Sequence, residues 1–179
     1  MTSDPELYAL AARAGGQLLA AGRRIATAES CTAGWIAKAL TDVPGSSQWL
    51  ECGYVTYSDA AKMRDLKVRE RTLADFGAVS EQTAREMADG ALRVPGVSVA
   101  LAVTGIAGPD GGTAAKPVGT VWFCAAARHD GAVERLVERQ LFPGDRAAVR
   151  RAAVQHALSL LLRLDLRPRS AAAIPPGQA

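Results

Sequence analysis

Apolar residues recur at helical spacing in several parts of this chain, and short apolar runs lie between them. The first face begins after Asp4, a helix cap, and Pro5, at the first helical position. It is formed by Leu7, Leu10, Ala11, Ala14 and Leu18. The same spacing predicts helices over residues 5–22, 32–41, 58–66, 70–76, 80–92 and 144–164.

Runs rich in β-branched and aromatic residues predict strands over residues 24–28, 49–57, 97–103, 118–126 and 132–141. The run 97–103 is almost wholly apolar, which is typical of a central strand that is buried on both faces. Helices that alternate with strands predict an α/β three-layer sandwich, in which helices cover both faces of a mixed, mainly parallel sheet. The two consecutive late strands predict an antiparallel edge.

The chain has 179 residues, and we expect one domain over residues 1–167 with a disordered tail over 168–179. The net charge of +3 is mild and the basic residues are dispersed, so we expect no nucleic-acid partner. We find neither a signal peptide nor a membrane span. Three scattered cysteines without a CxxC pair predict no metal site and no disulfide framework, and reduced thiols favour a cytoplasmic location.

The segment Thr27-Ala-Glu-Ser-Cys-Thr-Ala-Gly34 places a serine where a predicted strand passes into a predicted helix. Backbone N–H groups at a helix start lack partners, and the helix dipole favours negative charge there. An attacking alkoxide and the oxyanion that it produces are both such charges. Ser30 is therefore a candidate nucleophile, although a serine before a helix is most often only an N-cap.

Lys62 follows the end of strand 49–57, on a short predicted helix. Strand ends in α/β sheets gather at one edge, where sites usually form. A lysine there is most often a solvated surface charge. If Lys62 faces Ser30, however, burial would let it lose its proton and serve as the base of a serine–lysine pair.

The loop Thr104-Gly-Ile-Ala-Gly-Pro-Asp-Gly-Gly-Thr113 directly follows the central strand. Glycines let the backbone approach a ligand closely and expose N–H groups to anions. The loop lacks the P-loop and GxGxxG spacings. A plain surface turn is the alternative, but the loop's length and position favour ligand binding.

Other residues have two interpretations each. Cys31 lacks a partner, because His129 and His156 lie in a turn and in the last helix, so a packed side chain is the simpler interpretation. Glu29 either orients the serine–lysine pair or favours the helix start electrostatically. Arg146 opposes the dipole at the start of the last helix, which indicates either a nearby anion or a solvated arginine.

Several segments, in the same order, resemble the CinA C-terminal domain family, and within it the stand-alone nicotinamide-nucleotide amidohydrolases. They are Thr27-Ala-Glu-Ser-Cys-Thr-Ala-Gly34, Gly53-Tyr-Val-Thr-Tyr-Ser58, Gly77-Ala-Val-Ser80, Thr104-Gly-Ile-Ala-Gly-Pro-Asp-Gly-Gly112, Lys116-Pro-Val-Gly-Thr-Val-Trp122 and Phe142-Pro-Gly-Asp-Arg146. The resemblance covers the chain from about Leu7 to Leu164. This chain departs from the family at Ala33, where Gly is usual, and at Asp59-Ala60, where Asn-Glu is usual.

The resemblance implies hydrolysis of nicotinamide mononucleotide to nicotinate mononucleotide and ammonia, in pyridine-nucleotide salvage, without metal or cofactor. Ser30 would attack the amide carbon, neutral Lys62 would take its proton, and helix-start N–H groups near Cys31 and Thr32 would hold the oxyanion. Burial must lower the pKa of Lys62, because an ordinary lysine, with a pKa of about 10.4, supplies too little base at neutral pH.

The remaining expected site residues fall into two groups. Those expected to orient the reaction or to hold the oxyanion are Glu29, Cys31, Thr32 and Thr104. Those expected to bind the substrate are Tyr57, Gly105, Ile106, Ala107, Gly108, Gly111, Gly112, Lys116 and Arg146. Tyr57 is a candidate for the ring pocket or for the core.

The expected partner is a small molecule, nicotinamide mononucleotide. We also expect the protein to associate with itself, and we expect no membrane partner. The alternative is a non-catalytic nucleotide-binding or regulatory module linked to competence or DNA damage. Intact Ser30 and Lys62 favour the enzyme.

Overall fold

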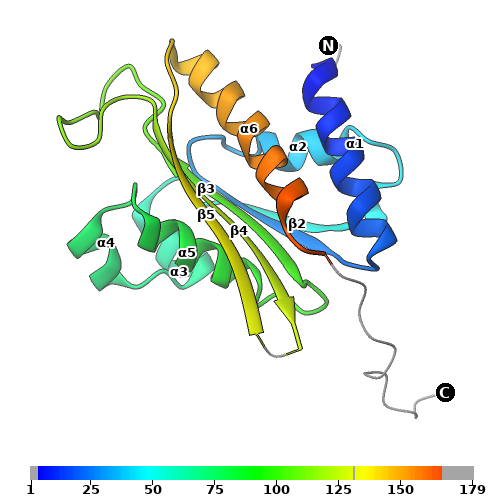
Figure 1. The fold of residues 1–179 in the computed structure, drawn as a ribbon. Coiled ribbons are helices and arrows are strands. Elements are labelled where there is room, and N and C mark those ends of the chain that lie inside the picture. Colours follow the sequence, from blue (N-terminus) through cyan, green and yellow to red (C-terminus); the bar gives the residue numbers. More distant parts are fainter. Residues whose placement is uncertain (1–3, 131, 167–179) are drawn as a thin grey trace.

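The computed structural model describes residues 4–130 and 132–166, which form a sheet with a layer of helices on each face (Figure 1). The sheet has five strands in the order β2-β1-β3-β4-β5. In that order they are Leu50–Val55, Ile25–Glu29, Val99–Gly105, Thr120–His129 and Ala132–Leu141. β1 is parallel to β2 and β3, whereas β4 and β5 add an antiparallel edge. The predicted α/β sandwich with a mixed sheet is confirmed. The expected tail over 168–179 lies outside the described residues.

The helices divide between the two faces of the sheet (Figure 1). One face is covered by α1 (Pro5–Ala20), α2 (Trp35–Thr41) and α6 (Arg146–Arg163). The other side holds α3 (Asp59–Leu66), α4 (Glu70–Phe76) and α5 (Glu81–Ala91), and a short 3₁₀ helix, Ser46–Gln48, precedes β2. None of the helices within the described ranges has the length and apolar character that a membrane crossing requires.

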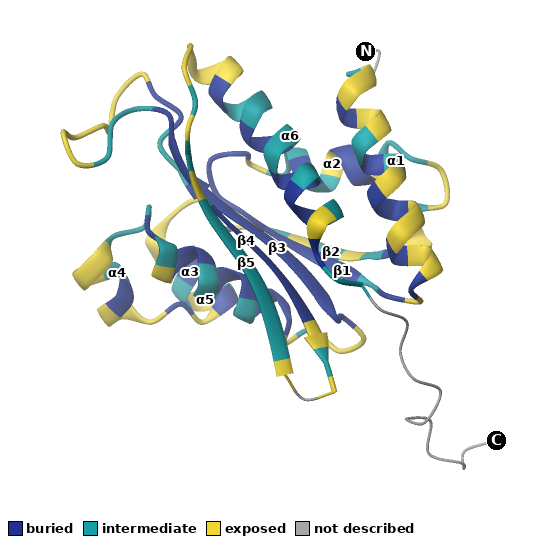
Figure 2. Cartoon of the chain, viewed as in Figure 1, coloured by how far each residue is buried: buried dark blue, intermediate teal, exposed yellow. Residues whose placement is uncertain are grey.

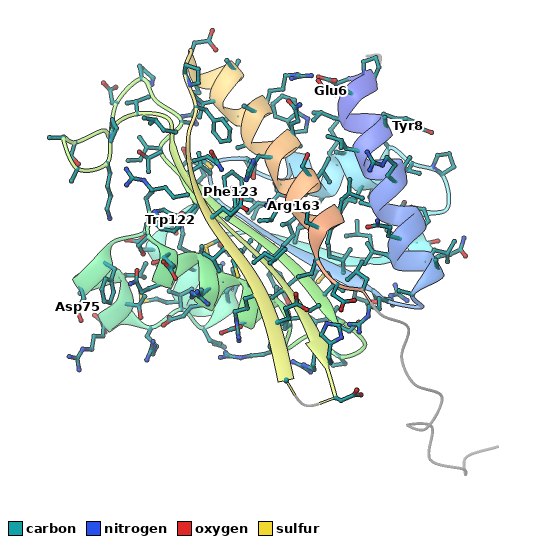
Figure 3. The ribbon with its side chains drawn as sticks, in the orientation of Figure 1. Glu6, Tyr8, Asp75, Trp122, Phe123 and Arg163 are labelled. Carbon is teal, nitrogen blue, oxygen red and sulfur yellow. The ribbon has the colours of Figure 1, made fainter. Side chains whose placement is uncertain are left out.

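The core lies on both faces of the central strands β1 and β3, whose residues are buried except at the end of β3 (Figure 2). Successive side chains of β4 alternate between these faces, because a strand repeats every two residues. Phe123 packs into the cluster under α6, whereas Trp122 packs on the α5 side (Figure 3). Burial on both faces explains why the sequence of β3 shows a continuous apolar run rather than an alternation.

Element order follows the sequence prediction, but several boundaries move by a few residues. The strand predicted over 118–126 is Thr120–His129, so His129 belongs to β4 rather than to the turn. The largest change concerns the helix predicted from residue 32, which begins only at Trp35. Ala33 and Gly34 have φ of 52° and 87°, a left-handed conformation that a right-handed helix cannot include. Residues 31–34 therefore form a turn.

The carboxyl ends of the parallel strands meet at one edge of the sheet. The N–H of Ser30 donates to the carbonyl of Val103 at 3.0 Å, beside the end of β3. The N–H of Thr56 donates to the carbonyl of Glu29 at 2.9 Å, which ties the end of β2 to the end of β1. The topology thus brings three segments that are distant in the sequence to one place.

Candidate active site

Ser30 and Lys62 meet at this edge. Their Oγ and Nζ atoms lie 3.1 Å apart, and the residues are only 7% and 1% exposed. Lys62 lies in the first turn of α3, a helix that starts where Ser58 caps the N–H of Ala61. Ser30 is not the N-cap of α2, because that position is held by Gly34. The N-cap interpretation of Ser30 is therefore wrong.

The burial of Lys62 makes its ammonium group easier to deprotonate than that of an exposed lysine. Burial lowers the pKa of Lys62 from its ordinary value of 10.5, while the nearby charge of Asp59 opposes this shift. Nζ also donates to the carbonyl oxygens of Thr56 and Tyr57, at 2.9 and 3.1 Å. A neutral amine has two N–H groups and one lone pair. If the two carbonyls take the two hydrogens, the lone pair is left for the hydroxyl of the serine.

Glu29 does not bond the serine–lysine pair but holds the start of α2. Its fully buried carboxylate accepts from the N–H groups of Ile36 and Ala37, at 3.0 and 2.9 Å. It also accepts from the hydroxyls of Thr32 and Thr27, at 2.7 and 3.3 Å. Of the two interpretations of Glu29, stabilisation of the helix start is therefore the correct one. The hydroxyl of Thr32 is committed to this carboxylate.

The expected oxyanion donors near Cys31 and Thr32 do not belong to the start of α2, which begins at Trp35 and whose Ile36 and Ala37 N–H groups are occupied by Glu29. Within the described part of the chain, no other residue accepts a hydrogen bond from the backbone N–H groups of Cys31 and Thr32, and the N–H of Cys31 interacts only with its own thiol. They belong to the turn that follows the serine. If the protein holds an oxyanion, these N–H groups are the available donors.

Two other residues expected in the site, Cys31 and Thr104, are not available to react with a substrate or to donate to it. Burial raises the pKa of Cys31 to about 12, so its side chain stays a thiol at neutral pH and is unsuited to nucleophilic attack. The hydroxyl of Thr104 donates to the carbonyl of Ala78 at 2.8 Å. Thr104 thereby orients the segment between α4 and α5 rather than offering its proton to a ligand.

Ser30 and Lys62 line a cavity of about 190 Å³. Its lining residues are Ser30, Cys31, Tyr57, Lys62, Ala78, Val79, Thr104, Gly105, Ala107 and Arg146. Sequence reasoning missed Ala78 and Val79, which come from the segment before α5. The stretch Gly77-Ala-Val-Ser80, one of those that resemble the family, was the signal that could have found them.

Arg146 spans the mouth of this cavity. Its Nη1 donates to the carbonyl of Gly108 at 2.9 Å, and its Nη2 bonds the Tyr57 hydroxyl at 3.2 Å. Tyr57 is 60% exposed, so it belongs to the mouth and not to the core. The negative charge at the start of α6 comes from Asp145, which caps the N–H of Ala148 at 2.8 Å. A bound anion is therefore not needed to explain a cation at this helix start.

The rest of the predicted binding loop stays outside the cavity lining. Ile106, Gly111 and Gly112 do not line it, and Gly108 contributes through its bond to Arg146. Lys116 donates from Nζ to the carbonyl of Phe76 at 2.7 Å, which joins the loop to the end of α4. The expected binding residues therefore form two groups. One group lines the cavity beside Ser30, and the other lies on the loop outside the cavity lining.

Comparison with known proteins gives the family of this chain. The CinA C-terminal domain matches residues 7–164. The chain belongs to this family. Nicotinamide-nucleotide amidohydrolase PncC of Escherichia coli K12 is 52% identical over 160 residues, which cover 89% of this chain and 94% of that protein. The Pseudomonas putida protein of the same name is 51% identical over 161 residues, covering 90% and 98%.

A solved structure of this family has the same fold. It is the competence/damage inducible protein CihA from Agrobacterium tumefaciens, with a TM-score of 0.84 and 44% identity. The match covers 90% of this chain and 98% of that one.

The charge of Arg146 in this CinA C-terminal domain favours an anionic ligand. Arg146 lines the cavity together with Lys62, and no carboxylate lies among the lining residues of the described chain. Within residues 4–130 and 132–166, no group of three or more His, Cys, Asp or Glu side chains is placed to hold a metal ion. The chemistry to be explained is therefore that of a serine and a lysine beside an arginine.

Proposed function

We propose that this protein is a nicotinamide-nucleotide amidohydrolase, which converts nicotinamide mononucleotide and water to nicotinate mononucleotide and ammonia. The relatives that are 52% and 51% identical bear that name. The observation that carries the proposal is the 3.1 Å distance between Ser30 Oγ and Lys62 Nζ, two buried residues that line the same cavity. The reaction would serve pyridine-nucleotide salvage.

In the first half of the reaction, Ser30 attacks the carbon of the carboxamide. Its proton passes to the neutral amine of Lys62 as the Oγ–C bond forms, and the carbonyl oxygen becomes an oxyanion. The N–H groups of Cys31 and Thr32 are the proposed donors to that oxyanion. When the C–N bond breaks, protonated Lys62 gives its proton to the departing nitrogen, which leaves as ammonia.

In the second half, water replaces ammonia. Lys62, neutral again, takes a proton from water while the resulting hydroxide attacks the nicotinoyl ester on Ser30. Collapse of the second oxyanion breaks the bond to Oγ, and Lys62 returns the proton to the serine. Each step uses the same pair of atoms, so the reaction requires no other acid or base.

Arg146 is the proposed contact for the phosphate, and Tyr57 for the ring or the ribose. Both line the cavity at its mouth, and a guanidinium has five N–H donors, of which the protein contacts use two. The backbone of Gly105 and Ala107 completes this side of the cavity. The phosphate contact would come from the arginine side chain rather than from the α6 helix start.

A cytoplasmic location and self-association belong to the same proposal. The free thiols of Cys31, Cys52 and Cys124 support a reducing compartment. Light scattering by the purified protein tests self-association.

The test of the proposed function is ammonia release from nicotinamide mononucleotide by the purified protein, with Ser30→Ala as the control. We expect wild-type release and none above background from the folded variant. Ammonia release by folded Ser30→Ala at the wild-type rate would remove Ser30 from the mechanism. No release by the wild type would favour a non-catalytic nucleotide-binding module.

A further inference from the structure

The turn that follows Ser30 is held from the far end of the chain by Arg150, a residue of α6. Its Nε donates to the carbonyl oxygen of Cys31 and its Nη2 to that of Thr32, each at 3.0 Å. The guanidinium also lies 5.6 Å from the ring centre of Trp35, the first residue of α2. Arg150 is half-buried and does not line the cavity. One planar group therefore contacts both the turn and the helix after it.

The turn that Arg150 contacts has a backbone conformation that its own residues do not favour. Ala33 has a φ of 52°, which costs an L-residue roughly 1–2 kcal/mol. Such a conformation persists only where surrounding contacts hold it. On one side the carboxylate of Glu29 holds the Thr32 hydroxyl and the first N–H groups of α2. On the other side the carbonyls of the turn are held by Arg150.

The direction of the carbonyls fixes the direction of the neighbouring N–H groups. A trans peptide is planar, and its C=O and N–H point in opposite directions. Because the carbonyl of Cys31 is turned toward α6, the N–H of Thr32 in the same peptide is turned away from α6. The N–H of Thr32 has no acceptor within the described residues.

We propose that Arg150 is a positioning residue of the hydrolysis: it sets the turn that follows Ser30 and orients the N–H of Thr32, one of the proposed oxyanion donors. Arg150 itself touches neither the substrate nor the reacting atoms. The inference rests on the proposed function where its test measures ammonia release. It also predicts that loss of Arg150 lowers the reactivity of the Ser30 hydroxyl, which can be measured without the substrate. Loss of Arg150 should therefore slow the chemistry without weakening substrate binding.

The experiment compares Arg150→Met and Arg150→Lys with Arg151→Met. Arg151 is a matched control, since it follows on the same helix and its bonds to Asp4 and Glu6 lie away from the cavity. We expect Arg150→Met to lower kcat for nicotinamide mononucleotide by about 10- to 100-fold, because small misplacements of reacting groups have effects of this size. KM should stay within about twofold, and Arg150→Lys should recover part of the rate, because one ammonium can still bond a carbonyl.

A second readout does not depend on the substrate. An alkyl fluorophosphonate forms a bond from Ser30 Oγ to phosphorus, the P–F bond breaks, fluoride leaves and the serine proton passes to Lys62. Its phosphoryl oxygen takes the oxyanion position. We expect its second-order labelling rate to fall in Arg150→Met in parallel with kcat, and to stay at the wild-type value in Arg151→Met. Circular dichroism gives the folded fraction of each variant, and rates are referred to folded protein.

The outcomes separate this inference from the proposed function. Wild-type kcat and labelling in folded Arg150→Met would overturn it, as would a raised KM at unchanged kcat. If Arg150→Met does not fold, the same comparison is made with Arg150→Lys, for which unreduced kcat and labelling count against the inference. If the wild type labels at Ser30 but releases no ammonia, the proposed function fails and the labelling rates still decide the role of Arg150. Absence of both reactions in the wild type would overturn both proposals.

Discussion

Replacing Glu29 by glutamine is expected to destabilise the protein strongly. Oε1 accepts from the Thr27 hydroxyl and the Ala37 N–H, and Oε2 accepts from the Thr32 hydroxyl and the Ile36 N–H. All four partners are donors in this arrangement. A carboxamide has the same shape as a carboxylate but only one oxygen. Glu29→Gln therefore turns an NH₂ group toward a backbone N–H donor, whichever way the amide is placed, and the threonine hydroxyl on that side must reverse its direction to accept.

The size of the effect follows from the backbone hydrogen bond and the buried negative charge that are lost. A hydrogen bond to a charged group contributes about 1.5–3 kcal/mol, and donors left unpaired in the interior add a cost. Removal of one partner from a buried charged arrangement typically costs about 3–5 kcal/mol. We expect the free energy of unfolding to fall by about 3–5 kcal/mol. At about 2–4 °C per kcal/mol for a chain of this size, the melting temperature falls by roughly 6–20 °C.

Urea unfolding at pH 7, followed by circular dichroism, measures this loss. Glu51→Gln is the matched control, because Glu51 lies on the neighbouring strand β2 and its side chain, 35% exposed, pairs with Arg24 at 2.8 Å. A surface pair of this kind contributes about 0–1 kcal/mol. If both variants lost the same small amount, the Glu29 carboxylate would not be holding the start of α2, and the reasoning would fail.

Four further changes test the site. Lys62→Arg should be as inactive in ammonia release as Lys62→Ala, because a guanidinium is not deprotonated in proteins; a wild-type rate would eliminate the base. Arg146→Ala should raise KM for the mononucleotide about 10- to 100-fold and hardly affect the riboside, since charge-assisted contacts contribute about 1.5–3 kcal/mol; equal losses would mean a structural role. Asp59→Asn removes a carboxylate that raises the pKa of Lys62, so the limb of the pH–rate profile that rises with deprotonation should move to lower pH; an unmoved limb would contradict this. Ala33→Gly should stabilise the fold by about 1 kcal/mol, because its φ is 52°; a lower melting temperature would argue against strain there.

The order and type of the long elements could be predicted from the sequence because their patterns are local. The apolar face of α1 recurs at helical spacing, and the apolar run of β3 identifies a strand that is buried on both faces. The site could be predicted only in part. Ser30 and Lys62 could be named from their positions at strand ends, but no local pattern states that their side chains meet at 3.1 Å.

The turn after Ser30 could not be predicted, because tertiary contacts fix it. Residues 32–34 continue a helix-forming run by composition, and the buried carboxylate of Glu29 and the guanidinium of Arg150 override that preference. The wall formed by Ala78 and Val79 was missed for a similar reason. It presents small apolar residues whose place depends on the bond from Thr104 to the Ala78 carbonyl.

The strand β5 has one partner, β4, so its other side is an open edge in the described structure (Figure 1). A second copy that extended the sheet there about a twofold axis would place residues of the same face opposite each other. Pairing centred on Leu136 sets Glu134 against Glu138, and pairing centred on Val137 sets Arg135 against Arg139. Like charges directly opposite destabilise such a pair. The charge order of this edge therefore opposes growth of the sheet from one molecule into the next, and we expect any self-association to use another surface.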